Sequence, residues 1–379
     1  MTVRVALAEP RDASYDILIG RGLLADLPAL AKAACPASRY AVITDSHVAK
    51  LYGEQLVARC RGAGLQVELL EFPAGERSKT RETWASLSDR MLAAQLGRDS
   101  AVIALGGGVV GDVAGFVAAT YLRGIPCIQV PTTLLAMIDS SIGGKTGVDV
   151  PAGKNLLGAF HQPQLVVADL DVLGSLPAPQ LAAGMAEAVK HGVIADRRYF
   201  DALEQEHGAV TAREPEALER VVRRSIEIKG EVVGADEREA GRRAILNFGH
   251  TVAHAIEATS KFATLHGEAV AIGMAYEARL AEALGIAEAG TADRLQRLLA
   301  RYALPLELPR SATVDDLIAA MQLDKKAREG TVRFALPRAI GRMYADGKSW
   351  TVAAPQAVVR DVLGGGGRRA YRGEAGINK

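Results

Sequence analysis

The sequence predicts a parallel α/β domain followed by a mainly α-helical domain. In the first half, short apolar runs alternate with helical patterns, which is typical of βαβ units. From about residue 177 strand-like runs become rare and long helical patterns follow. Hydrophobic residues make up 49% of the 379 residues, which is enough to bury two sizeable cores.

Five apolar runs in the first half predict the strands of the parallel sheet. They cover residues 40–44, 66–70, 101–105, 125–130 and 165–168. The third run is uniformly apolar, as expected of a strand that is covered on both faces. A helical pattern over residues 80–95 lies between the second and third runs. We therefore assign residues 1–176 to the α/β domain.

Five helical patterns and one late strand describe the second half. The helices are predicted over residues 180–195, 215–233, 251–259, 268–284 and 291–302. A strand is predicted over residues 331–336, after a Glu-Gly turn. We assign residues 177–355 to this domain and 356–379 to a C-terminal segment. Its Gly-rich, basic part from about residue 364 is predicted to be flexible.

The charge balance excludes several classes of protein. There are 45 Lys and Arg against 44 Asp and Glu, so the formal net charge of +1 argues against a strongly cationic nucleic-acid binder. Aromatic residues amount to only 5%, which leaves few stacking platforms for bases. The 3 cysteines form no short-spaced pair, which favours a reducing compartment. No targeting or membrane-spanning segment is evident, so we expect a soluble cytoplasmic protein without a membrane partner.

A glycine-rich turn follows the third predicted strand. Residues 106–112 satisfy G-x-G-x-x-G and precede a helical segment, where free N–H groups and the helix dipole favour phosphate. A tight turn without a ligand is the alternative. The acidic residue of the usual dinucleotide fingerprint is missing from residues 126–131. Asp45, Thr132 and Thr133, each at or just after a strand end, could supply the cofactor contacts instead.

Histidines and glutamates of the second half predict a metal site. His250 and His254 are spaced i, i+4 on one helix face, and His266 follows 16 residues after His250. Glu187 and His191 share the same i, i+4 spacing. The spacing alone does not select the three ligands, and Glu257 and Glu268 are further candidates.

Three cations lie in Gly-rich or polar stretches that we interpret as loops. They are Arg123, Lys145 and Lys154. Exposed amides plus one point charge suit phosphate, although neither lysine stretch is a P-loop. A solvated surface is the alternative for any one of them, and their number favours an anionic substrate.

Taken together, the motifs resemble the 3-dehydroquinate synthase family of sugar-phosphate cyclases. The matching stretches are residues 73–79, 106–112, 131–133, 139–155, 185–187, 247–250, 265–268 and 323–326. The resemblance implies an NAD-binding α/β domain, a helical domain that binds zinc or cobalt, and an active site between them. It implies conversion of 3-deoxy-D-arabino-heptulosonate 7-phosphate to 3-dehydroquinate and phosphate. The implied steps are transient oxidation, β-elimination of phosphate, re-reduction, ring opening and aldol closure.

The resemblance also assigns roles by matching position. The implied metal ligands are Glu187, His250 and His266, which leaves His191 structural. The implied substrate contacts are Lys145, Asn155, Lys229, Arg243, Asn247, His254 and Lys325. Asp139, Lys190 and Glu239 would line the site, and Arg123 would reach phosphate, which it could do from the neighbouring subunit of a homodimer. The implied cofactor contacts are Asp45, Gly75, Glu76, Lys79, Gly107, Gly108, Val109, Asp112, Thr132, Thr133, Lys145, Lys154, Val172 and Ser175.

Three other functions remain as alternatives. Another sugar-phosphate cyclase, of the 2-deoxy-scyllo-inosose or 2-epi-5-epi-valiolone synthase type, would share the fold, NAD and metal. Arg243, Asn247 and His254 match the dehydroquinate type instead. A metal-dependent polyol dehydrogenase would not need the cations near Lys145 and Lys154. An NAD-binding sensor would not need a complete set of catalytic residue types.

Overall fold

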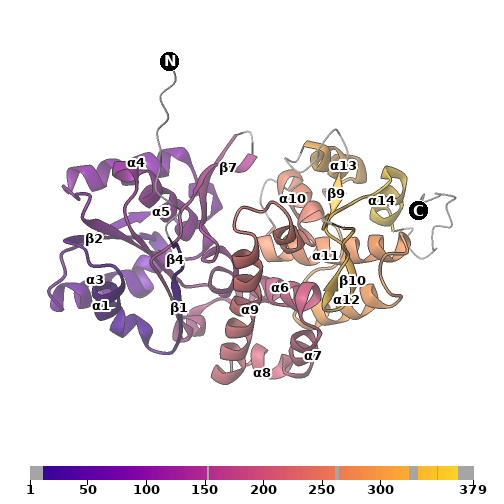
Figure 1. Cartoon of the computed structure of the whole chain (residues 1–379), viewed down its shortest axis with the longest axis horizontal. Coiled ribbons are helices and arrows are strands. Elements are labelled where there is room, and N and C mark those ends of the chain that lie inside the picture. Colours follow the sequence, from indigo (N-terminus) through magenta and orange to yellow (C-terminus); the bar gives the residue numbers. More distant parts are fainter. Residues whose placement is uncertain (1–11, 152, 261–263, 324–331, 348, 366–379) are drawn as a thin grey trace, which may run out of the picture.

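Six parallel strands form the sheet of the N-terminal half, in the spatial order β1-β8-β5-β4-β2-β3. Figure 1 labels β1, β2 and β4 of this sheet. The computed structural model describes residues 12–151, 153–260, 264–323, 332–347 and 349–365. The strands are β1 (Asp16–Gly20), β2 (Arg39–Asp45), β3 (Val67–Phe72), β4 (Ser100–Gly106), β5 (Cys127–Pro131) and β8 (Leu165–Asp169). The five predicted strands are therefore confirmed. β1 was not predicted, because this edge strand is only partly buried and carries a weak apolar signal.

Helices cover both faces of the sheet, as parallel strands require. On one face α1 (Leu23–Ala34) and α3 (Glu54–Gly62) pack against strand residues such as Val42. On the other face α4 (Arg81–Ala93) and α5 (Gly108–Thr120) pack against their neighbours, such as Ile43. The short helix α2 (Ser46–Val48) follows β2. Three free cysteines, Cys35, Cys60 and Cys127, are buried in these two cores.

An antiparallel hairpin corrects our interpretation of the two lysine stretches as loops. Its strands are β6 (Lys145–Val150) and β7 (Gly153–Phe160). Lys145 begins β6 and Lys154 lies in β7, so both side chains project from regular backbone. The hairpin packs on α5, where a Cβ atom added to Gly115 would lie 2.5 Å from Thr146 Cγ2. Frequent glycines and charges hid the alternation of the apolar residues.

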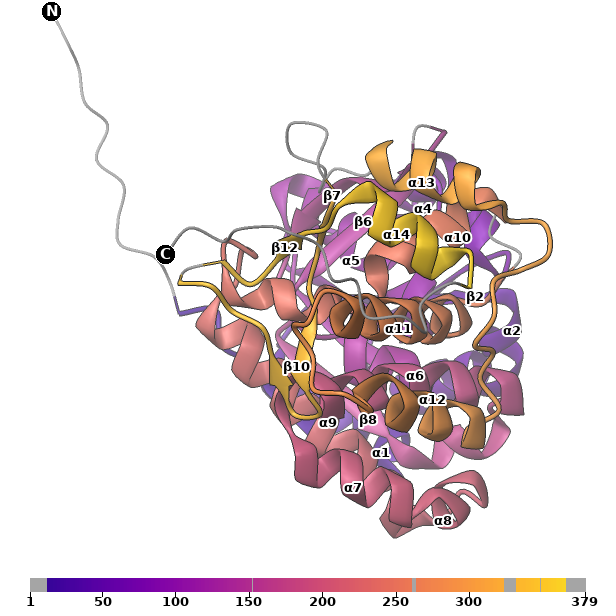
Figure 2. The same cartoon turned by 90° about the vertical axis from the view of Figure 1, so that its right-hand side faces the viewer.

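Nine helices make up most of the C-terminal half in the described ranges. They are α6 (Ala178–Ala195), α7 (Arg197–Gln205), α8 (His207–Thr211), α9 (Pro215–Ala235), α10 (His250–Thr259), α11 (His266–Ala283), α12 (Thr291–Arg301), α13 (Val314–Leu323) and α14 (Gln356–Leu363). All five predicted helices are present within two residues of their expected ends. The central helix α11 is buried along most of its length and contacts α6, α10, α12 and α14 (Figure 2).

Short strands in this half modify the prediction of a single late strand. The structure has β9 (Arg333–Phe334), β10 (Pro337–Ala339), β11 (Arg342–Met343) and β12 (Val352–Ala353), paired as two small antiparallel ladders. Thr331, the predicted first residue of the late strand, and the tail after Gly365 lie outside the described residues. Among the described helices, none has the length and apolarity needed to cross a membrane. The domain boundaries stay a prediction.

Candidate active site

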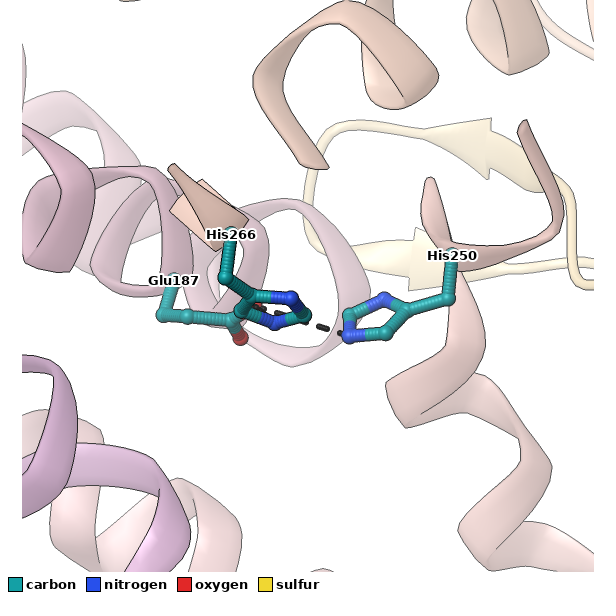
Figure 3. Close-up of side chains that lie close together, drawn as sticks. All are labelled: Glu187, His250 and His266. Carbon is teal, nitrogen blue, oxygen red and sulfur yellow. Dashed lines mark ion pairs between the residues drawn. The ribbon is translucent and has the colours of Figure 1, made fainter. Parts of the chain in front are cut away.

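Three side chains from three helices converge where α6, α10 and α11 meet (Figure 3). Glu187 is fully buried on α6, His250 is the first residue of α10, and His266 is the first residue of α11. The Nε2 atoms of His250 and His266 lie 3.7 Å and 3.8 Å from Glu187 Oε1. One ligand atom from each residue lies within 4.8 Å of the other two, so this cluster can hold a metal ion.

Close helix packing at glycines brings these three residues together. A Cβ atom added to Gly267 would lie 2.0 Å from the carbonyl oxygen of Ala183, so α11 rests directly on the backbone of α6. A Cβ atom added to Gly273 would lie 1.9 Å from the carbonyl oxygen of Gly249, so α11 also touches the backbone before α10. Both contacts require glycine on α11. They place the first residue of α11 beside the other two side chains.

The carboxylate of Glu187 suits a bound cation. It lies in ion-pair contact with Lys190, and both residues are buried. Yet neither oxygen of Glu187 has a partner with hydrogen-bond geometry among the described residues. A buried carboxylate in this state is unfavourable unless a further positive partner satisfies it. The residues present therefore fit a divalent metal.

A second possible group shares the same glutamate. His191 is fully buried, and its ligand atom lies within 4.8 Å of those of Glu187 and Asp139. Burial and the charge of Lys190 hold the pKa of His191 well below its usual range, so its ring is neutral. Lys190 and Lys229 also lie near this group. Lys229 already pairs with the Asp139 carboxylate of this group, so we retain the cluster with His250 and His266 as the candidate metal centre.

An outer chain of charges leads away from His266. Its Nδ1 atom lies 3.2 Å from Glu257 Oε1, and Lys154 Nζ lies 3.1 Å from the same oxygen. Lys154 also lies 2.9 Å from Glu76 Oε1. Burial alone would raise the pKa of Glu257, but the hydrogen bond and charge of His266 and the charge of Lys154 lower it to about 2. Spacing offered Glu257 as a metal ligand, whereas the structure places it behind His266 and, among the described residues, in neither group of possible ligands.

Two lysines predicted to contact substrate are paired with predicted site acids. Lys229 Nζ lies 2.5 Å from both Asp139 Oδ1 and the Asp139 backbone carbonyl oxygen. Partial burial would raise the pKa of Asp139, but the charges of Lys229 and Lys190 hold it well below its usual range. Lys145 is half-exposed and forms an ion pair with Glu239. Each of the two ammonium groups is therefore held by a carboxylate that is itself a predicted site residue.

Arg243 and Asn247 lie on the short segment Arg242–Asn247 that follows Glu239, whereas Asn155 lies in the hairpin. Arg243 is buried, and its guanidinium donates to the carbonyl oxygens of Glu237 and Gly143. Burial lowers its pKa. Asn247 Nδ2 donates to Glu239 Oε1 at 2.5 Å, and His254 packs with its ring centroid 5.6 Å from that of His250. Asn155 lies in β7, with its backbone N–H bonded to Asp149.

The predicted cofactor contacts gather at the carboxyl edge of the sheet. They lie at or after the ends of β2, β3, β4, β5 and β8: Asp45, Gly75, Glu76, Lys79, Gly107, Gly108, Val109, Asp112, Thr132, Thr133, Val172 and Ser175. The chain order reverses between β2 and β4, whose ends are Asp45 and Gly106. Ligands of open α/β sheets bind at such a switch point.

The glycine-rich turn lies at this edge of the sheet, where the start of α5 packs closely against Thr133 and Ser140. Gly107 caps α5, and a Cβ atom added there would lie 3.2 Å from Thr133 Cγ2. One added to Gly108 would lie 3.1 Å from Ser140 Oγ. The first N–H groups of a helix have no partner within the helix, and such groups favour a phosphate. Asp112, further along α5, forms an ion pair with the buried Lys79.

One predicted residue, Arg123, is not brought to this site by its own chain. Arg123 is exposed beyond the C-terminal end of α5, which is about 20 Å from the glycine-rich turn at 1.5 Å per residue. Its action in its own chain is therefore disfavoured, which leaves the neighbouring subunit as its expected target. Lys325 lies outside the described residues. Tyr15 belongs to none of the sequence motifs and was not predicted, yet its hydroxyl accepts the Gly143 N–H at 3.0 Å.

The fold and the candidate site are those of a class of enzymes with an α/β half and a helical half, and solved sugar-phosphate cyclases represent this class. A 2-epi-5-epi-valiolone synthase from Streptomyces hygroscopicus subsp. jinggangensis 5008, with NAD+ and Zn2+ bound, is 34% identical with a TM-score of 0.85 over 95% of this chain and 98% of that chain. A 2-deoxy-scyllo-inosose synthase complexed with carbaglucose-6-phosphate, NAD+ and Co2+ is 28% identical, with a TM-score of 0.84 over 92% and 95% of the two chains.

Sequence comparison identifies the family within this class. Residues 69–183 match the 3-dehydroquinate synthase N-terminal family and residues 184–327 match the C-terminal family. A 3-dehydroquinate synthase from Symbiobacterium thermophilum is 55% identical over 325 residues, which are 85% of this chain and 91% of the relative. The chain belongs to the 3-dehydroquinate synthase family, and the resemblance seen in the motifs is confirmed.

Proposed function

We propose that this protein is a 3-dehydroquinate synthase that uses NAD and a divalent metal, zinc or cobalt. It would convert 3-deoxy-D-arabino-heptulosonate 7-phosphate to 3-dehydroquinate and phosphate. The observation that carries the proposal is the convergence of Glu187, His250 and His266 in a chain that is 55% identical to a relative of that name. Solved cyclases of the same fold with NAD+ and Zn2+ or Co2+ bound support the choice of cofactors.

The chain's own residues divide into groups that would hold cofactor, metal and substrate. When bound, NAD supplies reversible hydride acceptance and the metal supplies Lewis acidity at the reacting hydroxyl. Glu187, His250 and His266 would hold the metal. The edge of the sheet at Gly107 and Thr133 would hold the cofactor, because its free N–H groups suit the pyrophosphate. The substrate would then lie between these two groups.

Lysines and arginines would orient the two anionic groups of the substrate. Lys145 is half-exposed, and the ammonium at the end of its flexible side chain pairs with Glu239. This ammonium can therefore turn toward a carboxylate or phosphate of the substrate. Arg243 is held by carbonyl oxygens and keeps its charge in a fixed place. Lys229 and Asp139 form a close pair that could hold a proton near a substrate hydroxyl. Most of the rate advantage would come from holding one flexible molecule in order.

Purified protein with NAD and Zn2+ is expected to release phosphate from the heptulosonate phosphate without net NADH. Phosphate release and absorbance at the NADH band, measured in one reaction, test this. Steady accumulation of NADH would indicate a dehydrogenase and contradict the proposal. Glucose 6-phosphate serves as the competing substrate, because a carba-analogue of it is bound to the related inosose synthase. Faster turnover of glucose 6-phosphate would favour that rival.

We also propose a homodimer whose contact includes strand β7. This strand lies at the edge of the hairpin and exposes Leu156, Leu157 and Phe160. An apolar edge strand favours pairing with another chain. His161 Nε2, just after β7, lies 2.9 Å from the carbonyl oxygen of Ile125, which is two residues after Arg123 in the chain. A partner seated there would meet Arg123, which fits its expected reach to the neighbouring subunit.

Leu157→Glu is expected to convert the dimer to a monomer. A charge in an apolar contact costs desolvation that one edge strand cannot offset. Light scattering after size exclusion should give a mass near twice 40.0 kDa for the unmodified chain and near 40.0 kDa for the variant. Leu51→Glu is the matched control, because Leu51 is an equally exposed leucine on the α2–α3 side of the sheet. A monomeric unmodified chain would contradict the proposal.

A further inference from the structure

We propose that Glu257 is a positioning residue for the metal ligand His266, and that Lys154 ties this glutamate to the N-terminal half. The inference rests on the proposed metal site and deepens it. Glu257 would not itself bind the metal. Its buried carboxylate would fix the orientation of His266 and form an ion pair with Lys154 of the hairpin.

The two nitrogens of the His266 ring face two different carboxylates. Nδ1 lies 3.2 Å from Glu257 Oε1, and Nε2 lies 3.8 Å from Glu187 Oε1. An ionised carboxylate only accepts hydrogen bonds, so the proton of the neutral ring belongs on Nδ1. The lone pair of Nε2 then points toward Glu187 and the metal position. A carboxylate behind a metal-bound histidine fixes its tautomer and raises its basicity.

Helix α10 carries both His250 and Glu257. On α10, His250 and Glu257 are seven residues apart, which is about two turns, so both side chains lie on one face. The side chain of Glu257 is 3% exposed, so packing holds it in place. A single helix thus supplies one ligand in its first turn and orients the ligand of a neighbouring helix two turns later. Any shift of α10 would move His250 and the Glu257 carboxylate behind His266 together.

Lys154 balances the charge of the buried Glu257 carboxylate. Lys154 Nζ lies 3.1 Å from Glu257 Oε1 and 2.9 Å from Glu76 Oε1. Lys154 comes from β7 and Glu76 follows β3, so this bridge joins α10 to two segments of the sheet half. Both residues are predicted cofactor contacts. A cofactor that binds Lys154 would therefore also change the ion pair of the Glu257 carboxylate behind His266.

The test measures metal affinity of the full-length protein, because activity alone cannot separate ligation from catalysis. Zn2+ affinity is determined by competition with a chromophoric chelator. Glu257→Gln, which keeps a neutral acceptor, is expected to weaken binding about tenfold, and Glu257→Leu, which removes it, up to about 100-fold. The absorption bands of bound Co2+ should shift in both variants. Unchanged affinity in both, with only a lower melting temperature, would mean a structural role and overturn the inference.

Three further variants separate the outcomes. Glu282→Gln is the matched control, because Glu282 lies on α11 and accepts the Ala292 N–H at 2.9 Å, away from the site; it should leave Zn2+ affinity unchanged. Lys154→Met should weaken Zn2+ binding by less than Glu257→Leu, and an unchanged affinity would contradict the bridge. His250→Ala should lose the metal. If it does not, the proposed site itself fails; if it does while both Glu257 variants bind normally, only this inference fails.

Discussion

Replacement of His250 with alanine is expected to remove the bound metal and to lower kcat about a thousandfold or more. Loss of one of three protein ligands leaves too few donors to hold the ion, and the Lewis acidity that it supplies is worth several kcal/mol. The side chain of His250 is 12% exposed and begins α10, so alanine should cost little stability. Metal content after dialysis, kcat and melting temperature are measured on the same sample.

His191→Asn is the control that distinguishes the two possible metal groups. His191 and His250 both lie in groups of ligand atoms that include Glu187. The asparagine variant is expected to lose some stability, because His191 is fully buried, while its metal content stays at one ion. The opposite result, with metal lost in His191→Asn and kept in His250→Ala, would move the centre toward Asp139.

Local patterns predicted the buried parts of the fold and missed the exposed ones. β4 is buried at every position and was evident as an apolar run. β1 is an edge strand with partial burial, and its apolar run is limited to three residues, Ile17, Leu18 and Ile19. The hairpin was hidden for a related reason, because β7 is exposed along most of its length. Periodicity reports burial, so elements that are not covered within one chain leave little trace.

The choice of metal ligands could not come from spacing. His250 and His254 have the expected i, i+4 spacing, yet among the described residues His254 belongs to neither group of possible ligands. Glu187 and His266 reach His250 from other helices, and close contacts at Gly267 and Gly273 bring them there. Contacts of this kind are long-range in sequence. The family resemblance carried the choice, because a motif records the outcome of packing that spacing does not show.

The net charge of +1 and a site rich in cations are compatible because acids are built into the same site. Three of its lysines, Lys79, Lys145 and Lys229, each form an ion pair with a carboxylate from another segment. The substrate would therefore not meet bare positive charge. Its carboxylate and phosphate would have to share or replace these partners, which favours a ligand with two anions over one with a single anion.

Gly273→Ala is expected to destabilise the protein by about 3 kcal/mol, the upper end of the usual cost of overpacking, and to weaken metal binding. The added methyl group would lie 1.9 Å from the carbonyl oxygen of Gly249 and 3.1 Å from the backbone nitrogen of Ala253. Both atoms belong to the backbone, so no change of rotamer relieves the contact and α10 must move away from α11. On the same helix, the Glu277 carboxylate accepts the Gly249 N–H at 2.7 Å, and this bond would be stretched as well.

Urea unfolding of the metal-free protein and chelator competition for Zn2+ measure the two effects separately. Gly230→Ala is the matched control, because Gly230 lies within α9 and an added Cβ atom would have no heavy atom within 4 Å. That variant is expected to be as stable as the unmodified chain or more stable by up to about 1 kcal/mol, since alanine favours helix. Equal unfolding midpoints for the two variants would show that the α10–α11 contact can relax. Because this contact sets the distance between His250 and His266, loss of stability and loss of metal affinity should appear together in Gly273→Ala.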